Sequence, residues 1–176
     1  MGDTDRVSVW RQLRAIGPLP GVVAVLIPAA LLIFVRGPDP GFGLGAAPTA
    51  AIVVAGVALA AAGTALMYRT ITLFSRVGEG TLAPWDPTRR LVVLGPYRHV
   101  RNPMITGVLA VLIGEALAFG STAILIEAAI FLTANATYMP LVEERDLARR
   151  FGDEYEAYKR NVPRWIPRVS PWEPDV

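Results

Sequence analysis

Four long apolar segments divide the chain. They run from Leu19 to Val35, from about Ala46 to Tyr68, from about Pro103 to Phe119 and from about Ser121 to Met139. A helix needs about 20 mostly apolar residues to cross a membrane, so the pattern predicts about four transmembrane helices. Almost no loop separates the third segment from the fourth, which predicts that the last two helices form a tight hairpin.

An apolar stripe with helical spacing follows the fourth segment. Its positions step by three or four residues, as one face of a helix requires. The members are Leu147, Phe151, Tyr155, Tyr158 and Val162. The stripe begins at Glu144, beside Glu143, and Pro163 should end the helix. The two acids fit two readings: the first turn of an amphipathic surface helix, where the dipole favours them, or carboxylates that close a cleft.

Composition agrees with a membrane protein and narrows the chemistry. Of 176 residues, 53% are hydrophobic and 18% charged, with a mean hydropathy of +0.42. A soluble domain of this size does not hide so much apolar surface. Cysteine is absent and His99 is the single histidine. Disulfides, thiol nucleophiles and Cys- or His-cluster metal sites are therefore excluded, and we expect an all-α integral membrane protein without a metal.

The basic residues are distributed unevenly over the connecting segments. Three precede the first apolar segment, one follows it, six lie between the second and third, none lies in the hairpin turn and seven follow the fourth. Sixteen of the 17 thus fall on one side of a four-span chain. The positive-inside rule places both termini and the 69–102 segment in the cytosol. The many Ala, Gly and Pro residues and the single lysine suggest a bacterial gene, hence a bacterial inner membrane.

The loop before the third apolar segment carries candidate binding residues. Asn102 and Pro103 form a helix start, with Asn as N-cap and Pro at the first helical position. The free N–H groups of such a helix end favour an anion, and Arg98 and Arg101 add positive charge. In the alternative reading, these arginines and His99 are anchors that face lipid phosphates.

Two carboxylates lie within the apolar hairpin itself. Glu115 and Glu127 fall at similar distances from the turn at 120–121. Buried acids in a span are functional candidates by default. Because they lie close to the far interface, the alternative is that both reach water there, and their role stays open.

The loop and tail motifs together resemble a known family. The loop reads G-P-Y-R-H-V-R-N-P and the tail reads E-E-x-x-L-x-x-x-F-G-x-x-Y-x-x-Y-x-x-x-V-P-R-x-I-P. The pairing resembles the isoprenylcysteine carboxyl methyltransferase and phospholipid methyltransferase superfamily, more closely its bacterial branch, over roughly residues 78–168. The resemblance implies S-adenosylmethionine held in a cytosolic cleft between loop and tail, and methyl transfer to a lipid-like or amphipathic acceptor.

The resemblance also implies which residues contact the cofactor. Carried over by position, they are Arg90, Leu91, Val92, Tyr97, Asn102, Pro103, Met104, Ile105 and Glu143. Ile105 stands where the family often has Tyr. Met139 and Pro140 stand where the eukaryotic prenylcysteine enzymes have a substrate-binding Arg just before the Glu pair.

The acceptor decides which groups act in catalysis. For an amine acceptor, Glu144 is the candidate that takes the proton. For a carboxylate acceptor, Arg98 or Arg101 would orient it. Phospholipid amines, isoprenoid carboxylates and small thiols all remain open as acceptors, and membrane lipids, rather than nucleic acid or metal, are the expected partners.

Two other functions compete with methyl transfer. A membrane reductase using NADPH is one, because sterol reductases share a similar tail architecture, although the chain has no G-x-G-x-x-G fingerprint. A non-catalytic membrane protein is the other.

The chain divides into four segments along its length. We predict a cytosolic segment at 1–18, a two-span scaffold at 19–68, a methyltransferase-like cofactor region at 69–168 and a tail at 169–176.

Overall fold

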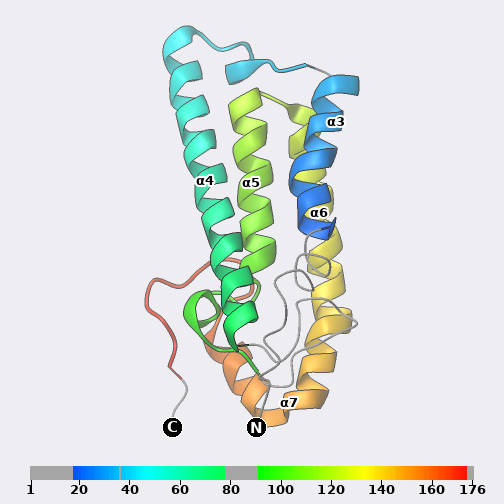
Figure 1. The fold of residues 1–176 in the computed structure, drawn as a ribbon, viewed down its shortest axis with the longest axis vertical. Helices are drawn as coiled ribbons and strands as arrows, with labels where there is room; N and C mark the ends of the chain where they lie inside the picture. Colours follow the sequence, from blue (N-terminus) through cyan, green and yellow to red (C-terminus); the bar gives the residue numbers. More distant parts are fainter. Residues whose placement is uncertain (1–17, 36, 78–90, 174–176) are drawn as a thin grey trace, which may run out of the picture.

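The computed structural model describes residues 18–35, 37–77 and 91–173 (Figure 1). Within these ranges the chain forms helices and loops and no strand, which confirms the predicted all-α class. Long helices lie side by side, with α7 and η3 at one end of them and η2 at the other (Figure 1). The elements are α2 (Pro18–Gly21), η1 (Val22–Leu26), α3 (Ile27–Phe34), η2 (Pro40–Gly43), α4 (Ala46–Val77), η3 (Gly95–Arg98), α5 (Pro103–Phe119), α6 (Thr122–Tyr138), η4 (Met139–Glu143) and α7 (Glu144–Asn161).

The first apolar segment is helical throughout, as predicted, although it contains a proline. Pro28 has no N–H to donate, and the chain meets this by widening the preceding turn. There η1 is a π-helical turn in which the Ile27 N–H donates to the Val22 carbonyl. The wider turn lets α2, η1 and α3 continue as one helical segment through the proline.

Helix α4 is longer than its apolar segment predicts. It continues past Tyr68 to Val77, through a stretch that mixes polar and apolar residues. The polar side chains there bond to the helix itself: the Thr70 hydroxyl donates to the Leu66 carbonyl at 2.8 Å and is fully buried. A hydroxyl satisfied in this way does not interrupt a helix.

Helices α4 and α5 pack at backbone contact, because glycines face one another across their interface. A Cβ atom on Gly63 would lie 2.6 Å from the Gly107 carbonyl oxygen, and one on Gly56 would lie 2.6 Å from that of Gly114. The seven-residue spacing on both helices brings the two pairs onto one seam. Small residues allow this close approach, which is typical of helix packing in membranes.

The hairpin turn between α5 and α6 is as short as the sequence predicts. Gly120 has a positive φ of 62°, a conformation that glycine adopts without strain. Ser121 caps α6, its hydroxyl accepting a hydrogen bond from the Ile124 N–H at 3.4 Å. The connection between α3 and α4 packs on this turn, where the Asp39 N–H donates to the Phe119 carbonyl at 2.8 Å.

At the opposite end, α6 continues through η4 into α7, which bends at Gly152 (φ 52°, ψ −128°). The predicted stripe lies on the inner face of this bent helix. Tyr155, Tyr158 and Val162 form a buried cluster, against which Leu147 and Phe151 pack. The stripe was correctly predicted as a face, but it is carried by two helical pieces rather than by one straight helix.

Within the residues that the structure describes, two helices are long and apolar enough to cross a membrane. They are α4 over Ala46–Leu73 and the continuous helix Thr122–Asn161, whose apolar part is α6. The segments Val22–Phe34 and Pro103–Phe119 are apolar but shorter. The charged residues of α7 and of the tail lie at the end of the bundle away from the hairpin turn (Figure 1).

Candidate functional site

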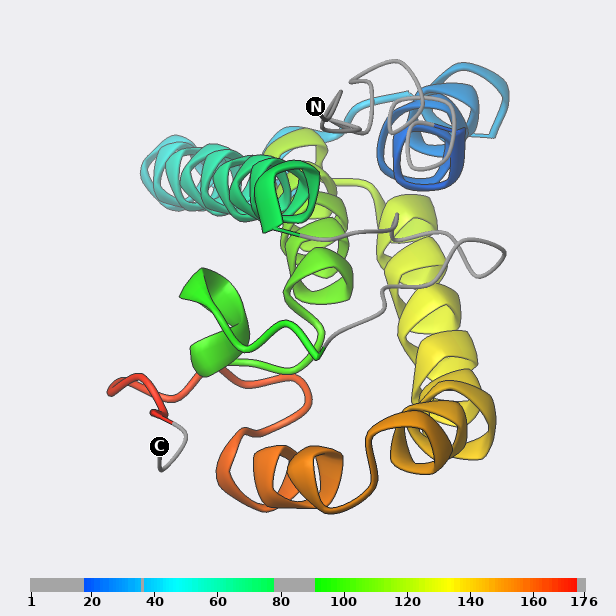
Figure 2. The ribbon, with the colours of Figure 1, turned by 60° about the horizontal axis from the view of Figure 1, so that its bottom comes forward.

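The loop that contains η3 lies beside the segment that follows α7, as Figure 2 shows. The two run antiparallel and are joined by backbone hydrogen bonds, which supports the expectation that loop and tail form one site. Three bonds of 2.9 Å link the Arg101 N–H to the Pro163 carbonyl, the Arg168 N–H to the His99 carbonyl and the Trp172 N–H to the Arg98 carbonyl. We call residues 95–102 and 162–173 the loop–tail clasp.

The buried side chain of Tyr158 connects the clasp to α7. The Tyr158 hydroxyl donates to the Tyr97 carbonyl at 2.8 Å, and the Tyr158 ring lies 5.9 Å from that of Trp172. Burial, and then the neighbouring Tyr158 and Glu143, raise the pKa of the Tyr97 hydroxyl well above its ordinary value. Tyr97, a predicted cofactor contact, is therefore held as a neutral hydroxyl by its surroundings.

Glu144 joins three parts of the site through its carboxylate. Arg164 donates to both of its oxygens, at 2.7 and 2.9 Å, and Arg101 donates to one of them at 3.0 Å. The Glu144 residue is only 6% exposed. Burial and the Glu144 charge raise the pKa of the adjacent Tyr155 hydroxyl to about 12, against the opposing effect of Arg101. Because two guanidinium groups occupy the Glu144 oxygens, this carboxylate first of all holds α7, loop and tail together.

Glu143 differs from its neighbour in having no such partner. Among the described residues its half-buried carboxylate makes no hydrogen bond and no ion pair. Burial, followed by the negative charges of Glu144 and Asp146, raises its pKa. A cationic ligand beside this carboxylate would relieve both effects.

The start of α5 has groups that lack partners as well. Asn102 is the N-cap and Pro103 the first helical residue, as predicted, but the Asn102 side chain makes no capping hydrogen bond. The Arg101 side chain is 10% exposed, and its buried Nε has no acceptor within the described part of the chain. Met104 and Ile105 are half-buried in the first turn. An anionic group placed here would meet free N–H donors and the positive end of the helix dipole.

Of the remaining predicted site residues, some form a wall of the site and others lie on the surface of the protein. Val92 is buried, and Leu91 packs against the tyrosine cluster of α7, which makes this stretch one wall of the site. The Arg98 guanidinium donates to the Trp172 carbonyl at 2.9 Å and pairs with Glu173. Arg90 lies outside the described residues.

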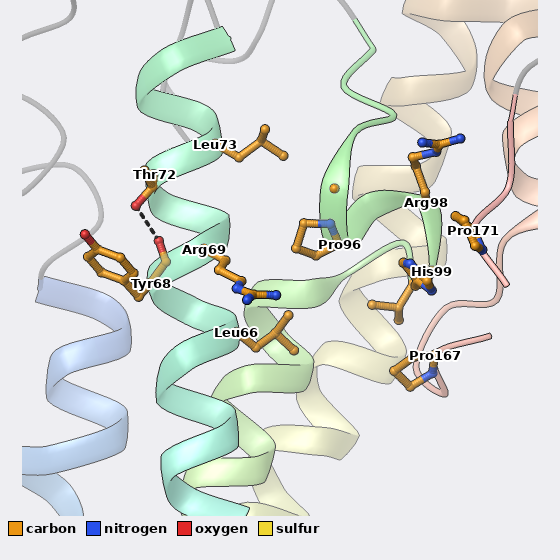
Figure 3. A pocket seen from close by; sticks show the side chains of 12 residues that line it. Leu66, Tyr68, Arg69, Thr72, Leu73, Pro96, Arg98, His99, Pro167 and Pro171 are labelled. Atoms are coloured by element: carbon orange, nitrogen blue, oxygen red, sulfur yellow. Dashed lines mark hydrogen bonds between the residues drawn. The ribbon is translucent and has the colours of Figure 1, made fainter. Parts of the chain in front are cut away.

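A pocket of about 710 Å³ lies on the other face of the loop, between α4 and the clasp (Figure 3). Its size is typical of small-molecule sites. The lining residues are Leu66, Tyr68, Arg69, Thr72 and Leu73 of α4, Gly95, Pro96, Arg98, His99 and Val100 of the loop, and Pro167 and Pro171 of the tail. Glu143, Glu144 and Tyr97 do not line it, so the pocket and the predicted cofactor residues occupy different sides of one short segment.

The acids inside the hairpin are also unpaired. Both carboxylate oxygens of Glu127 and one of Glu115 are buried without a hydrogen-bond partner in the described residues. They lie toward the hairpin turn, at the opposite end from the clasp. They therefore form no part of the site that the loop and tail build.

Comparison with known proteins identifies the family. The sequence profile of the phospholipid methyltransferase family matches residues 51–154, from α4 to α7. The chain belongs to this family. The resemblance seen in the loop and tail motifs is thereby confirmed.

The sequence of this family member is also similar to that of one curated protein. Methanethiol S-methyltransferase 2 of Bradyrhizobium diazoefficiens is 38% identical over 77 residues. The alignment covers 42% of this chain and 27% of the relative, so the chain spans only a fraction of the relative's length. No solved structure matches the chain.

Sequence reasoning missed three contributors to the site. Arg164 was part of the quoted tail motif without a role, and its partner Glu144 lies 20 residues earlier. Tyr158 was assigned to packing alone, although its hydroxyl positions the loop. The third is the Nδ1 atom of His99, which lies 2.8 Å from the Arg168 carbonyl. For Arg164 and Tyr158 the available signal was the length of the tail motif, which exceeds what a packing stripe needs, whereas His99 lies in the loop motif.

Proposed function

We propose that the protein is an S-adenosylmethionine-dependent membrane methyltransferase that acts on a lipid-like or amphipathic acceptor. The observation that carries the proposal is the loop–tail clasp, which brings the two motifs together at the start of α5. Methyl transfer needs positioning and exclusion of water more than covalent catalysis. The Cys-free, single-His composition is compatible with that chemistry.

The unpartnered groups of the site fit the amino-acid end of S-adenosylmethionine. That end carries a carboxylate and an ammonium group, and the adjacent sulfur is cationic. The orphaned Nε of Arg101 and the uncapped start of α5 would hold the carboxylate. The carboxylate of Glu143, which has no hydrogen-bond or ion-pair partner among the described residues, would hold a positive group. Tyr155 interacts electrostatically with both Arg101 and Glu143, which supports a common site.

The bound cofactor would supply an activated methyl group, and the chain's own residues would position it. Leu91 and Val92 would form an apolar wall, with Tyr97, Pro103, Met104 and Ile105 lining the rest. Glu144 could accept a proton from an amine, as predicted, only if one of its hydrogen bonds to an arginine were broken. Its three hydrogen bonds to Arg101 and Arg164 favour a positioning role instead.

The membrane arrangement follows from the same architecture. The four apolar segments would cross the bilayer, the two shorter ones packed among the others. The clasp, α7 and both termini would lie in the cytosol, where the basic residues concentrate. The acceptor would enter laterally from the bilayer, while the cofactor enters from the cytosol.

Calorimetric titration of S-adenosylmethionine into the full chain in detergent tests the cofactor site. Arg101→Lys keeps a cation beside Glu144 but removes the Nε donor, so binding should weaken about tenfold. Arg150→Lys, in an exposed pair with Asp146, is the matched control and should leave binding unchanged. Unaltered affinity in Arg101→Lys would contradict the placement of the cofactor carboxylate.

Labelled methyl transfer to a total membrane-lipid extract tests the acceptor class. The expected result is a lipid product that gains one methyl group, identified by its mass. S-methylation of a small thiol is the second candidate, because the relative that is 38% identical is a methanethiol S-methyltransferase by name. Label incorporated into an added thiol, with none in the lipids, would select the second candidate over the first.

A further inference from the structure

The buried hydroxyl of Tyr155 accepts a hydrogen bond and has its own proton left to donate. The residue is 2% exposed and lies in the second helical piece of α7, beyond the bend at Gly152. The Arg101 Nη1 donates to the Tyr155 oxygen at 3.5 Å. A guanidinium group has no acceptor atom, so the hydroxyl proton must point away from Arg101.

This proton has no acceptor within the described residues. The Glu144 carboxylate beside it already takes three hydrogen bonds from two arginines. Tyr158, its neighbour in the buried cluster, differs in this respect, because that hydroxyl donates to the Tyr97 carbonyl at 2.8 Å. A buried donor without an acceptor is costly and rare. The Tyr155 proton is therefore suited to an acceptor that a ligand brings.

A second donor without an acceptor belongs to the group that contacts this hydroxyl. The Nε atom of Arg101 is buried and makes no hydrogen bond in the part of the chain that the structure describes. Helix α5 starts two residues later, at Pro103, and its first N–H groups have no acceptor within the helix. Two buried donors in contact, next to the positive end of a helix, favour an anionic ligand.

A carboxylate of opposite preference lies within electrostatic reach of the same hydroxyl. The charge of Glu143 contributes to raising the pKa of Tyr155, although burial and Glu144 contribute more. Glu143 itself has no hydrogen-bond or ion-pair partner among the described residues, so it favours a positive group. A ligand that satisfies both parts has a negative and a positive group close together, as an α-amino acid does.

We infer that the Tyr155 hydroxyl, together with Arg101 Nε, binds the α-carboxylate of the methyl donor and makes the protein specific for a donor with a complete amino-acid end. The inference rests on the proposed S-adenosylmethionine site and names the residue that selects this donor. A donor without the carboxylate would leave two buried N–H and O–H groups unpaired, and sites of this kind discriminate strongly against such a ligand. Packing against Tyr158 and Val162 holds the Tyr155 ring in place for this role.

Calorimetric titration of the full chain in detergent compares S-adenosylmethionine with its decarboxylated form, which keeps the sulfonium and ammonium groups and lacks the carboxylate. The wild type should bind the decarboxylated form about 100-fold more weakly. Tyr155→Phe should lower the affinity for S-adenosylmethionine about tenfold or more and leave that for the decarboxylated form within about twofold. A merely structural role of the hydroxyl would weaken the binding of both ligands equally, and that result would overturn the inference.

Two other tyrosines provide matched controls for the loss of a hydroxyl. Tyr158→Phe removes the hydroxyl that positions the loop, so it should weaken the binding of both ligands to a similar extent. Tyr138→Phe changes a residue at the end of α6 that is 44% exposed, and it should alter neither affinity. A greater loss of selectivity in Tyr158→Phe than in Tyr155→Phe would overturn the assignment to Tyr155.

Further arms of the experiment separate this inference from the proposed function. Arg101→Lys removes the other donor of the pair and should also lose affinity for S-adenosylmethionine alone, which keeps the carboxylate site testable if Tyr155→Phe does not fold. Equal losses of both ligands in Arg101→Lys, or equal affinity of the wild type for both, would overturn the inference and leave the cofactor proposal standing. Absence of S-adenosylmethionine binding by the wild-type chain would overturn both.

Discussion

Glu144 and Arg164 form a two-bonded ion pair, with the Nε and one terminal nitrogen of the guanidinium 2.7 and 2.9 Å from the two carboxylate oxygens. The pair ties the first turn of α7 to the tail that leaves its end. Arg101 adds the loop to the same carboxylate. One buried acid thus fixes the relative positions of the three segments that build the site.

Removing Arg164 should therefore destabilise the clasp. Arg164→Met leaves the buried Glu144 with one guanidinium in place of two, and the free energy of unfolding should fall by about 2 kcal/mol. Arg150→Met is the control, because its i,i+4 pair with Asp146 is exposed and should contribute less than about 0.5 kcal/mol. Denaturant unfolding in detergent, followed by circular dichroism, measures both. Equal stability of the two variants would contradict the role of the pair.

The hydroxyl of Tyr158 should position the loop as well as stabilise it. Tyr158→Phe removes the donor to the Tyr97 carbonyl and leaves that carbonyl without this bond, at a cost of about 1–2 kcal/mol. The affinity for S-adenosylmethionine should fall in parallel, because Tyr97 belongs to the predicted cofactor wall. Unfolding and calorimetric titration on the same preparation separate the two effects. A variant with wild-type stability and unchanged affinity for S-adenosylmethionine would show that this hydrogen bond does not position the loop.

The buried tyrosines predict a loss of stability in alkali. Burial raises the pKa of Tyr155 to about 12 from its ordinary value of 10.0, and that of Tyr97 in the same direction. The folded state therefore holds these protons more tightly than the unfolded state. The stabilisation is complete below pH 10 and is lost as the pH rises toward 12. Tyr155→Phe should show a smaller decrease than the wild type in denaturant titrations across this range; an identical decrease would contradict the assignment.

Much of the fold could be predicted because each helix is defined by its own local sequence. The apolar runs gave the bounds of three helices to within one or two residues, and a glycine that could adopt a positive φ marked the hairpin turn. The end of α4 beyond Tyr68 was missed because its polar side chains bond to their own helix, as Thr70 does. Hydropathy alone does not detect this.

The site could be predicted only in part, because it depends on pairings across long sequence separations. The motifs indicated that loop and tail belong together, and the Asn102 and Pro103 helix start was correct. The partner of Glu144 was not predictable, since Pro163 ends the helix and the tail then turns back to bring Arg164 to it. The bend at Gly152 was missed for a related reason: the apolar stripe continues in register across it.

The glycine seam between α4 and α5 should not tolerate a side chain. In Gly63→Ala the new Cβ would lie 2.6 Å from the Gly107 carbonyl oxygen, so the helices must separate. The expected cost is about 1–3 kcal/mol. Gly21→Ala is the control, because Gly21 has open space around it and a helical φ of −68°. Thermal unfolding in detergent should show a lower midpoint for Gly63→Ala alone; matching midpoints would contradict backbone contact along the seam.

Glu143 should show opposite effects on stability and on cofactor binding. Burial and neighbouring carboxylates raise its pKa above the ordinary value of 4.5, so the folded protein binds this proton more tightly than the unfolded chain. The wild-type free energy of unfolding therefore falls as the pH rises above 4.5. Glu143→Gln removes the buried charge and should stabilise the protein at neutral pH by about 0.5–2 kcal/mol.

The same substitution should weaken S-adenosylmethionine binding about tenfold or more, because a carboxylate that is costly to bury is kept for a cationic ligand. Glu156→Gln on the outer face of α7 is the control and should change neither quantity, since its pair with Lys159 is exposed. Unfolding and titration of the three proteins at one pH decide the point. A Glu143→Gln protein that is less stable than the wild type, or that binds the cofactor equally well, would show that this carboxylate serves the fold rather than the ligand.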